Sequence, residues 1–198
     1  ARHRRLVGSE MCIRDSNTRV LCAIPEEVEG LHYTDVFFTG VGKINAAATT
    51  EQIIRQYNPK LIINYGTAGS LDPSIKGLVK VTGFVDRDMD ARPLNFKLGQ
   101  TPYEKDIMIG KSDIVCGTGD TFATEKPKID CDIVDMEAYA IAKICKKNKV
   151  DFLCYKYISD SADGNASDDW VKNVAKGCKQ FREEILDNLS QPMMLQGW

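Results

Sequence analysis

Short apolar runs alternate with segments of helical periodicity along most of the sequence, and this alternation constrains the fold more than any other feature. The apolar runs typical of buried strands occupy residues 20–24, 36–38, 61–63, 78–85, 114–116 and 152–158. Apolar residues recur every three or four positions in residues 43–57, in residues 136–147 and from Ser167 onward. Helical crossovers join parallel strands, so the alternation predicts an α/β fold: a single domain with a mostly parallel, mixed central β-sheet flanked by helices.

The first sixteen residues do not fit this alternation. They carry four arginines and two acids, show neither strand nor helix periodicity, and lack the apolar stretch of a secretory signal. We therefore expect residues 1–16 to be a non-native or disordered segment and residues 17–198 to form the domain. A native basic arm is the alternative.

Composition excludes several classes of partner. A formal charge of -2 without a basic stripe argues against nucleic acid, and no run approaches the roughly 18 apolar residues of a membrane span. The seven cysteines form no Cys-x-x-Cys pair, which favours reduced thiols in a cytoplasmic protein. The two histidines, His3 and His32, are far apart, so no metal site is expected. Residues 40–43 (GVGK) match neither a Walker A loop nor a dinucleotide fingerprint, and no cofactor is expected.

Glycines and acids gather where the expected strands end. They lie at residues 26–27, 66–69, 117–120 and 159–160, and a further acidic group, residues 135–137, opens a helix. Singly, each has a structural explanation in the helix dipole or in turn geometry. Ligands of open α/β sheets bind beyond the carboxyl ends of the strands, so together these residues predict a site at one edge of the sheet.

Two carboxylates in this set have distinctive surroundings. Glu137 shares a helical face with Ile141 and Ile144, which turns it inward, where sugar hydroxyls would supply the hydrogen-bond donors it needs. Asp160 follows an apolar strand, a setting that raises the pKa of a carboxyl and suits it to general-acid work.

Six motifs carry a family resemblance. They are AIPEEV (23–28), GVGK (40–43), NYGTAG (64–69), GDTF (119–122), VDMEA (134–138) and ISDSAD (158–163). In this order they resemble the 5′-methylthioadenosine/S-adenosylhomocysteine nucleosidases of the purine nucleoside phosphorylase superfamily. The resemblance spans about residues 20–163 and implies a nucleoside phosphorylase-like fold.

The resemblance implies a role for each matching residue. Glu27 would position and deprotonate the attacking water, and Asp160 would protonate or hydrogen-bond N7 of the departing adenine. Glu137 would hold the ribose 2′- and 3′-hydroxyls, with Met136 packing on the sugar.

The remaining matches imply the rest of the pocket. Phe122 would stack on the purine, the backbone at Ala123 would read its edge, and Ser159 would also lie at the base. Thr67 stands where the family usually has serine, which keeps the hydroxyl, and its neighbours Gly66 and Ala68 complete the pocket.

The implied reaction is hydrolysis of the N-glycosidic bond of an adenine nucleoside: 5′-methylthioadenosine, S-adenosylhomocysteine or 5′-deoxyadenosine. One alternative is a phosphate-dependent phosphorylase. Phosphorolytic relatives place an arginine at the strand end corresponding to the neutral Asn64, although Arg55 and Arg87 remain as substitutes. A second alternative is a nucleoside-binding protein without turnover.

Two segments depart from the family pattern. Only eleven residues separate Val28 from Gly40, too few for the usual hairpin, and the stretch between Gly99 and the strand before Phe122 is also short. Residues 88–102 still resemble the loop that forms the family's dimer contact and part of its pocket. A homodimer is therefore expected, with the 5′-substituent left open.

Overall fold

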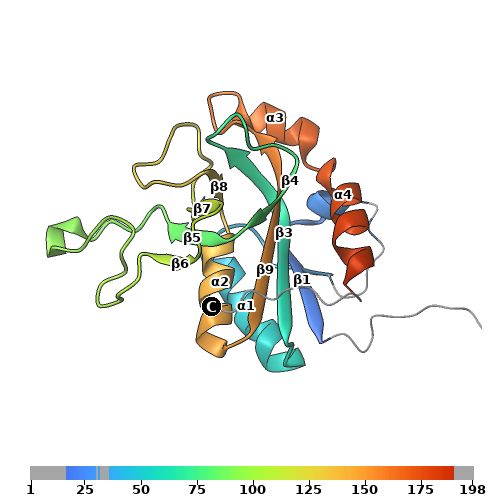
Figure 1. Cartoon of the computed structure of the whole chain (residues 1–198), viewed down its shortest axis with the longest axis horizontal. Coiled ribbons are helices and arrows are strands. Elements are labelled where there is room, and N and C mark those ends of the chain that lie inside the picture. The colour runs from blue at the N-terminus through green and yellow to red at the C-terminus, as the bar shows by residue number, and fades with distance from the viewer. Residues whose placement is uncertain (1–16, 30, 32–35, 190–198) are drawn as a thin grey trace, which may run out of the picture.

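Nine strands form one mixed sheet in the part of the chain that the computed structural model describes, residues 17–29, 31 and 36–189 (Figure 1). The predictions for residues 1–16 and for His32 lie outside these residues. The strands are β1 (Thr18–Cys22), β2 (Val36–Phe38), β3 (Leu61–Ser70), β4 (Leu78–Val81), β5 (Gly83–Asp86), β6 (Met108–Gly110), β7 (Val115–Thr118), β8 (Ile133–Asp135) and β9 (Asp151–Asp160).

Parallel pairing dominates the sheet. Its main path runs β2-β1-β3-β8-β7-β5-β6, while β9 pairs with β3 and β4 pairs with β9. The pairs β1–β2, β1–β3, β3–β9, β5–β7 and β7–β8 are parallel, and β3–β8, β4–β9 and β5–β6 are antiparallel. The expectation of a mostly parallel, mixed sheet in an α/β fold is confirmed.

Helices cover both faces of the sheet. On one face α1 (Lys43–Tyr57) and α2 (Ala138–Asn148) lie side by side, and on the other lies α4 (Gly177–Glu184), with α3 (Ala166–Asn173) near the carboxyl end of β9 (Figure 1). Alternate residues of β3 feed two cores, with Ile62 packed in the core beside α1 and α2 and Ile63 in the core beside α4. The Tyr65 and Phe181 rings stack at 4.1 Å between centroids in the second core.

Three short 3-10 helices complete the elements: η2 (Pro25–Val28), η3 (Arg92–Leu94) and η4 (Leu186–Asn188). No described helix is long and apolar enough to cross a membrane. Six of the seven cysteines fall within the described residues, and all six are free and buried.

The strand predictions need corrections. The first strand, expected at residues 20–24, is β1, which spans Thr18–Cys22. The expected strand at residues 78–85 is two strands, β4 and β5, which separate at Thr82 and pair with different partners. Strands β6 and β8, each of three residues, were not predicted.

The helix predictions need corrections at their faces and ends. Helix α1 has the predicted bounds. The spacing of Ile44, Ala47, Ala48, Ile54 and Tyr57 predicts its inward face, but Ile44 is 82% exposed and the buried face includes Ala46 and Ile53. The C-terminal helix expected from Ser167 onward is divided into α3 and α4 by residues 174–176, and α3 begins at Ala166 with Asn165 as its N-cap. Helix α2 begins at Ala138, two residues later than expected.

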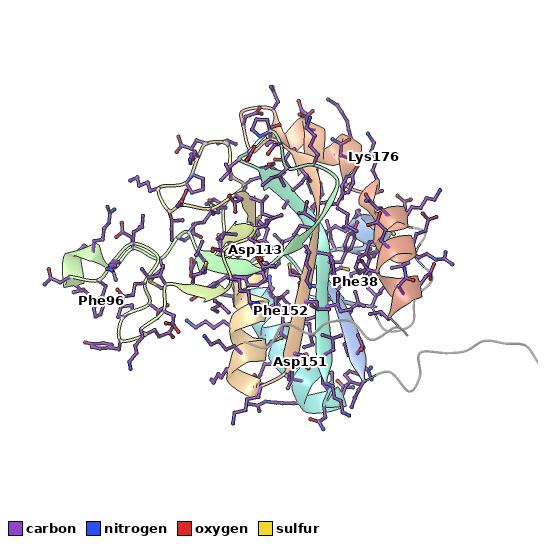
Figure 2. The ribbon with its side chains drawn as sticks, viewed as in Figure 1. Phe38, Phe96, Asp113, Asp151, Phe152 and Lys176 are labelled. Atoms are coloured by element: carbon purple, nitrogen blue, oxygen red, sulfur yellow. The ribbon has the colours of Figure 1, made fainter. Side chains whose placement is uncertain are left out.

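An arm of the chain projects from the sheet between β5 and β6 and carries η3 (Figure 1, green, at the left). Phe96 lies on this arm, far from the central sheet (Figure 2). On the same arm, the Leu94 and Tyr103 side chains are 67% and 94% exposed. The arm therefore offers apolar surface that the described part of the chain leaves exposed.

Candidate active site

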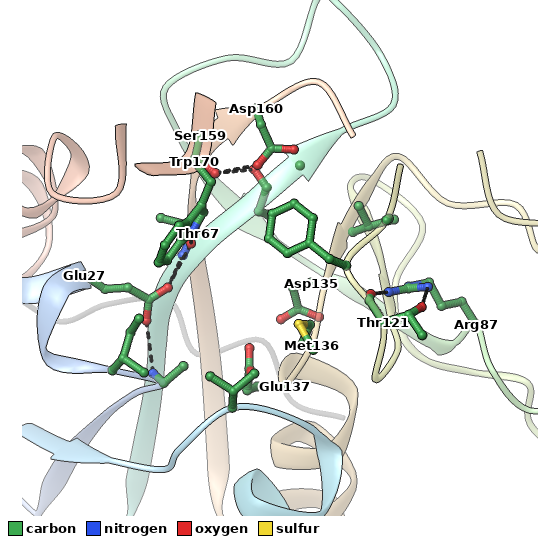
Figure 3. A pocket seen from close by; sticks show the side chains of 18 residues that line it. Glu27, Thr67, Arg87, Thr121, Asp135, Met136, Glu137, Ser159, Asp160 and Trp170 are labelled. Atoms are coloured by element: carbon green, nitrogen blue, oxygen red, sulfur yellow. Dashed lines mark hydrogen bonds between the residues drawn. The ribbon is translucent and has the colours of Figure 1, made fainter. Parts of the chain in front are cut away.

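A pocket opens where β3, β8 and β9 end, beside the N-termini of α1 and α2 (Figure 3). Its empty volume, counted with the solvent at its mouth, is about 820 Å³. The part of it that a water-sized sphere can occupy is about 270 Å³, close to the lower end of the usual range for small-molecule sites. The lining is mainly apolar, and four carboxylates converge on it: Glu27, Asp135, Glu137 and Asp160.

The Glu27 carboxylate is held in one position at the wall of the pocket. Pro25 begins the short helix η2, which turns the buried Glu27 side chain back towards β3. Glu27 Oε1 accepts hydrogen bonds from the Thr67 backbone N–H (2.7 Å) and the Thr67 hydroxyl (2.9 Å), and Oε2 accepts one from the Ala23 N–H (3.1 Å). Three donors thus fix one carboxylate, an arrangement that suits a group with a positioning task.

Gly66 makes room for Glu27 without lining the pocket. A Cβ at this position would lie 2.9 Å from Glu27 Oε1 and 3.2 Å from Lys156 Nζ. The sequence motif around residue 66 therefore reflects close packing behind the site, and Gly66 is not among the residues that line the pocket.

Glu137 is the N-cap residue of α2, so it precedes the helix in which it was predicted to lie. Its side chain is nonetheless buried and lines the pocket, as expected. The Gly42 N–H at the N-terminus of α1 donates to Glu137 Oε1 at 2.9 Å. Burial, with the neighbouring Asp135 carboxylate, raises the pKa of Glu137 from 4.5 to about 7.

This raised pKa predicts a pH dependence of stability. Between about pH 4.5 and pH 7 the folded state keeps the Glu137 proton while the unfolded state loses it, so the free energy of unfolding falls as pH rises. The contribution is about 3 kcal/mol. Glu137→Gln removes this term, and urea titrations at about pH 4.5 and pH 8 should show a smaller loss of stability with pH than in the wild type.

The exposed Glu125 provides the matched control for that experiment. Glu125→Gln should keep the pH dependence of the wild type. An identical pH dependence in Glu137→Gln and wild type would contradict the buried, protonated Glu137.

Asp160 is the last residue of β9, at the strand end where it was predicted. The Ser159 hydroxyl donates to Oδ2 at 2.8 Å, and the Ala162 N–H donates to Oδ1 at 2.9 Å. A Cβ on Gly69 would lie 2.6 Å from Oδ1, so glycine is needed beside it. Burial raises the pKa of Asp160 against the opposing effect of these hydrogen bonds, in the predicted direction.

Phe122 stands at the rim of the pocket, 45% exposed. The loop before it is tied to the sheet by Arg87, whose guanidinium donates to the Thr121 carbonyl and, at 3.1 Å, to the Thr121 hydroxyl (Figure 3). Asp120 accepts a 2.7 Å hydrogen bond from the Lys43 N–H. An aromatic face at the mouth of a cavity suits the stacking of a planar base.

Lys156 was missed by the sequence reasoning. It is fully buried below the pocket, and its Nζ lies 2.8 Å from Asp135 Oδ2. Burial alone lowers the pKa of Lys156, but Asp135 and further negative groups raise it well above its ordinary value. A lone lysine inside the apolar run 152–158 was the signal for it.

Asp135 and Trp170 also line the pocket and were not predicted as site residues. Asp135 accepts hydrogen bonds from Thr118 Oγ1 (2.6 Å) and the Ala138 N–H (2.9 Å), and with Lys156 these lower its pKa despite complete burial. Asp135 stands in a motif that the sequence had singled out, whereas nothing local marked Trp170.

The structure brings nearly all of the predicted site residues together. Nine of the ten line the pocket: Glu27, Thr67, Ala68, Phe122, Ala123, Met136, Glu137, Ser159 and Asp160. The exception is Gly66. Among the described residues, no group of three or more His, Cys, Asp or Glu side chains is arranged to hold a metal ion.

The position of Asn64 differs from the predicted strand end. It lies inside β3, not at its end, and is buried, with Nδ2 donating to the Leu21 carbonyl at 3.0 Å. Arg55 lies on α1 and pairs with Glu51 at 2.8 Å. Neither residue lines the pocket.

Comparisons with known proteins identify the family of the chain. The model of the Phosphorylase superfamily matches residues 35–115 and 109–190. The 5′-methylthioadenosine/S-adenosylhomocysteine nucleosidase of Staphylococcus haemolyticus is 32% identical over 179 residues, which cover 75% of this chain and 78% of that protein.

Solved structures share the fold at lower identity. A mutant of the Helicobacter pylori nucleosidase with 5′-methylthioadenosine in its active site has a TM-score of 0.77 and 22% identity, covering 86% of this chain and 98% of that one. The futalosine hydrolase of the same organism has a TM-score of 0.77 and 22% identity, covering 86% and 97%. At this identity the likeness concerns the fold.

Proposed function

The chain belongs to the Phosphorylase superfamily and, within it, to the 5′-methylthioadenosine/S-adenosylhomocysteine nucleosidases, and on this premise we propose that it hydrolyses the N-glycosidic bond of an adenine nucleoside. The products are adenine and the ribose derivative. Its enzyme class is that of the hydrolases acting on N-glycosyl compounds. The substrate class comprises 5′-methylthioadenosine, S-adenosylhomocysteine and 5′-deoxyadenosine.

The observation that carries this proposal is the arrangement of three carboxylates around one pocket. Glu27, Glu137 and Asp160 approach it from different elements, with Glu27 and Asp160 on separate sides and Glu137 at the N-terminus of α2 (Figure 3). An apolar cavity with a few convergent polar groups is typical of a small-molecule site.

The chemistry of the bond makes separate demands on these groups. Breaking an N-glycosidic bond builds positive charge on the sugar and negative charge on the base. In our proposal Asp160, whose pKa is raised, delivers a proton or hydrogen bond to N7, and Glu27 orients and deprotonates the water.

The other pocket residues hold the substrate. Glu137 hydrogen-bonds the ribose hydroxyls while Met136 packs on the sugar. Phe122 stacks on the purine, with Ala123 and Ser159 at the base. Thr67 and Ala68 line the pocket next to Glu27, where Thr67 serves as a hydrogen-bond donor.

Water is favoured over phosphate as the nucleophile because the cationic side chains near the site are already bound to other groups of the protein. Lys156 is committed to Asp135, and Arg87 binds the Thr121 loop. Asn64 and Arg55 lie outside the pocket. A phosphate would need a free cationic fork. Arg87 is the one arginine among the described residues that line the pocket, and its two terminal nitrogens already donate to Thr121.

Product analysis tests the reaction. Incubation of the protein with 5′-methylthioadenosine should release adenine and free methylthioribose at the same rate with and without phosphate, measured by chromatography. A strict phosphate requirement, with a sugar phosphate as product, would establish phosphorolysis instead. Saturable binding without adenine release would identify a nucleoside-binding protein.

We further propose that the protein is a homodimer. The projecting arm supports this, because Leu94 and Tyr103 present apolar surface that a second copy would cover. Light scattering should give twice the monomer mass, and Leu94→Asp should shift the population towards monomer. A monomer at tens of micromolar protein would contradict the proposal.

A cytoplasmic location is also proposed, and the six free, buried cysteines support a reducing compartment. Recovery of the protein from the culture medium of intact cells would contradict it.

A further inference from the structure

Trp170 reaches the pocket from α3 and contacts the residue that holds Glu27. Its indole Nε1–H donates to Thr67 Oγ1 at 2.9 Å (Figure 3). The same Thr67 oxygen lies 2.9 Å from Glu27 Oε1. Three side chains from η2, β3 and α3 therefore form one hydrogen-bonded series that ends at a carboxylate of the pocket.

The direction of every hydrogen bond in this series follows from the number of protons available. An indole Nε1–H only donates, and an ionised carboxylate only accepts. The threonine hydroxyl has one proton, and because it accepts from Trp170 its lone pair on that side is occupied. The hydroxyl proton is then directed to Glu27 Oε1, the acceptor within hydrogen-bond distance.

We propose that Trp170 is a positioning residue for Glu27, acting through Thr67. The indole N–H holds the Thr67 hydroxyl in the orientation in which it donates to Glu27, so that the carboxylate presents its remaining lone pairs to the water. This inference rests on the proposed function, in which Glu27 activates that water.

Helix α3 is well placed for this task because it is hydrogen-bonded to two strands of the pocket, β3 through Trp170 and β9 through Asn173. Asn173, the last residue of α3, donates from Nδ2 to the Ser159 carbonyl at 2.7 Å. Ser159 in turn donates to Asp160. The helix thus connects the strand end that carries Asp160 with the hydrogen bonds that hold Glu27.

Trp170→Phe separates the hydrogen bond from the aromatic packing. Phenylalanine keeps an apolar ring in the pocket wall but has no donor, so the Thr67 hydroxyl becomes free to rotate away from Glu27. We expect kcat for adenine release to fall about five- to tenfold, the effect of one lost hydrogen bond. KM should change less than about twofold.

Two further variants show whether the effect passes through Thr67. Val171→Ala, on the exposed side of the same helix, is the control for disturbance of α3 and should keep the wild-type kcat. In a Thr67→Ala background, Trp170→Phe should lower kcat no further. An unchanged kcat in Trp170→Phe, or an equal loss with and without Thr67, would overturn the proposal.

A spectroscopic measurement tests the same contact without turnover. The sequence has two tryptophans, so an amide–proton correlation spectrum contains two indole N–H signals, and Trp170→Phe assigns one of them. That signal should move in Thr67→Ala and to a lesser extent in Glu27→Gln. A signal that is unchanged in both variants would contradict the series of hydrogen bonds, whereas absence of adenine release by the wild type would refute the proposed function alone.

Discussion

Replacement of Asp160 by asparagine is expected to lower kcat for adenine release by about 10²–10⁴-fold while the fold survives. Asparagine has nearly the same shape: its one oxygen can accept from the Ala162 N–H in place of Oδ1, and its amide N–H, in place of Oδ2, can donate to the Ser159 hydroxyl oxygen. It carries no acidic proton to give to the departing base. The loss is therefore in the chemical step, and initial rates at saturating substrate measure it.

Asp163 offers a control three residues further along the chain. It is exposed and does not line the pocket, and its Oδ1 accepts from the Asn165 N–H, an interaction that an asparagine oxygen preserves. Asp163→Asn should turn over at the wild-type rate. Near-normal turnover by a folded Asp160→Asn protein would remove Asp160 from the mechanism.

The fold was largely predictable because local periodicity reports burial. The run at residues 36–38 and the helical spacing at residues 43–57 match β2 and α1 in both bounds. Apolar spacing did not identify the correct face of α1, where Ala46 and Thr50 are buried and Ile44 is exposed. Pairing decided the remainder, since the run at residues 78–85 divides where β4 joins β9 and β5 joins β7.

The site was predictable where its residues stand in motifs at strand ends. Asp160 ends β9, and Glu137 precedes α2, so both are positioned by elements that the pattern indicated. Contacts between segments that are far apart in the sequence could not be predicted. Trp170 meets Thr67 across 103 positions of the chain, and only the packing of α3 against the sheet brings them together.

Lys156→Met is expected to lower the free energy of unfolding by about 3–5 kcal/mol, because it leaves the buried Asp135 carboxylate without its cation. Lys156 and Asp135 are both almost completely excluded from solvent, and the Nζ–Oδ2 distance is 2.8 Å. Methionine fills a similar volume, so the loss is electrostatic and not a cavity effect. Urea unfolding at neutral pH measures it.

The loss of stability should depend on whether residue 135 is still a charged carboxylate beside residue 156, and this dependence gives the experiment its control. Adding Asp135→Asn to Lys156→Met removes the stranded charge and should restore part of the lost stability, since a neutral pair needs no ionic partner. Lys143, which binds Glu104 at the surface, is the matched single control, and Lys143→Met should cost less than about 1 kcal/mol. A Lys156→Met protein as stable as Lys143→Met would mean that Asp135 is not charged in the folded state.

That result would also change the interpretation of the pocket, because the Asp135 carboxylate contributes to the raised pKa of Glu137 while Lys156 opposes it. Stability and ribose binding would then have to be explained by a different distribution of protons among the buried carboxylates.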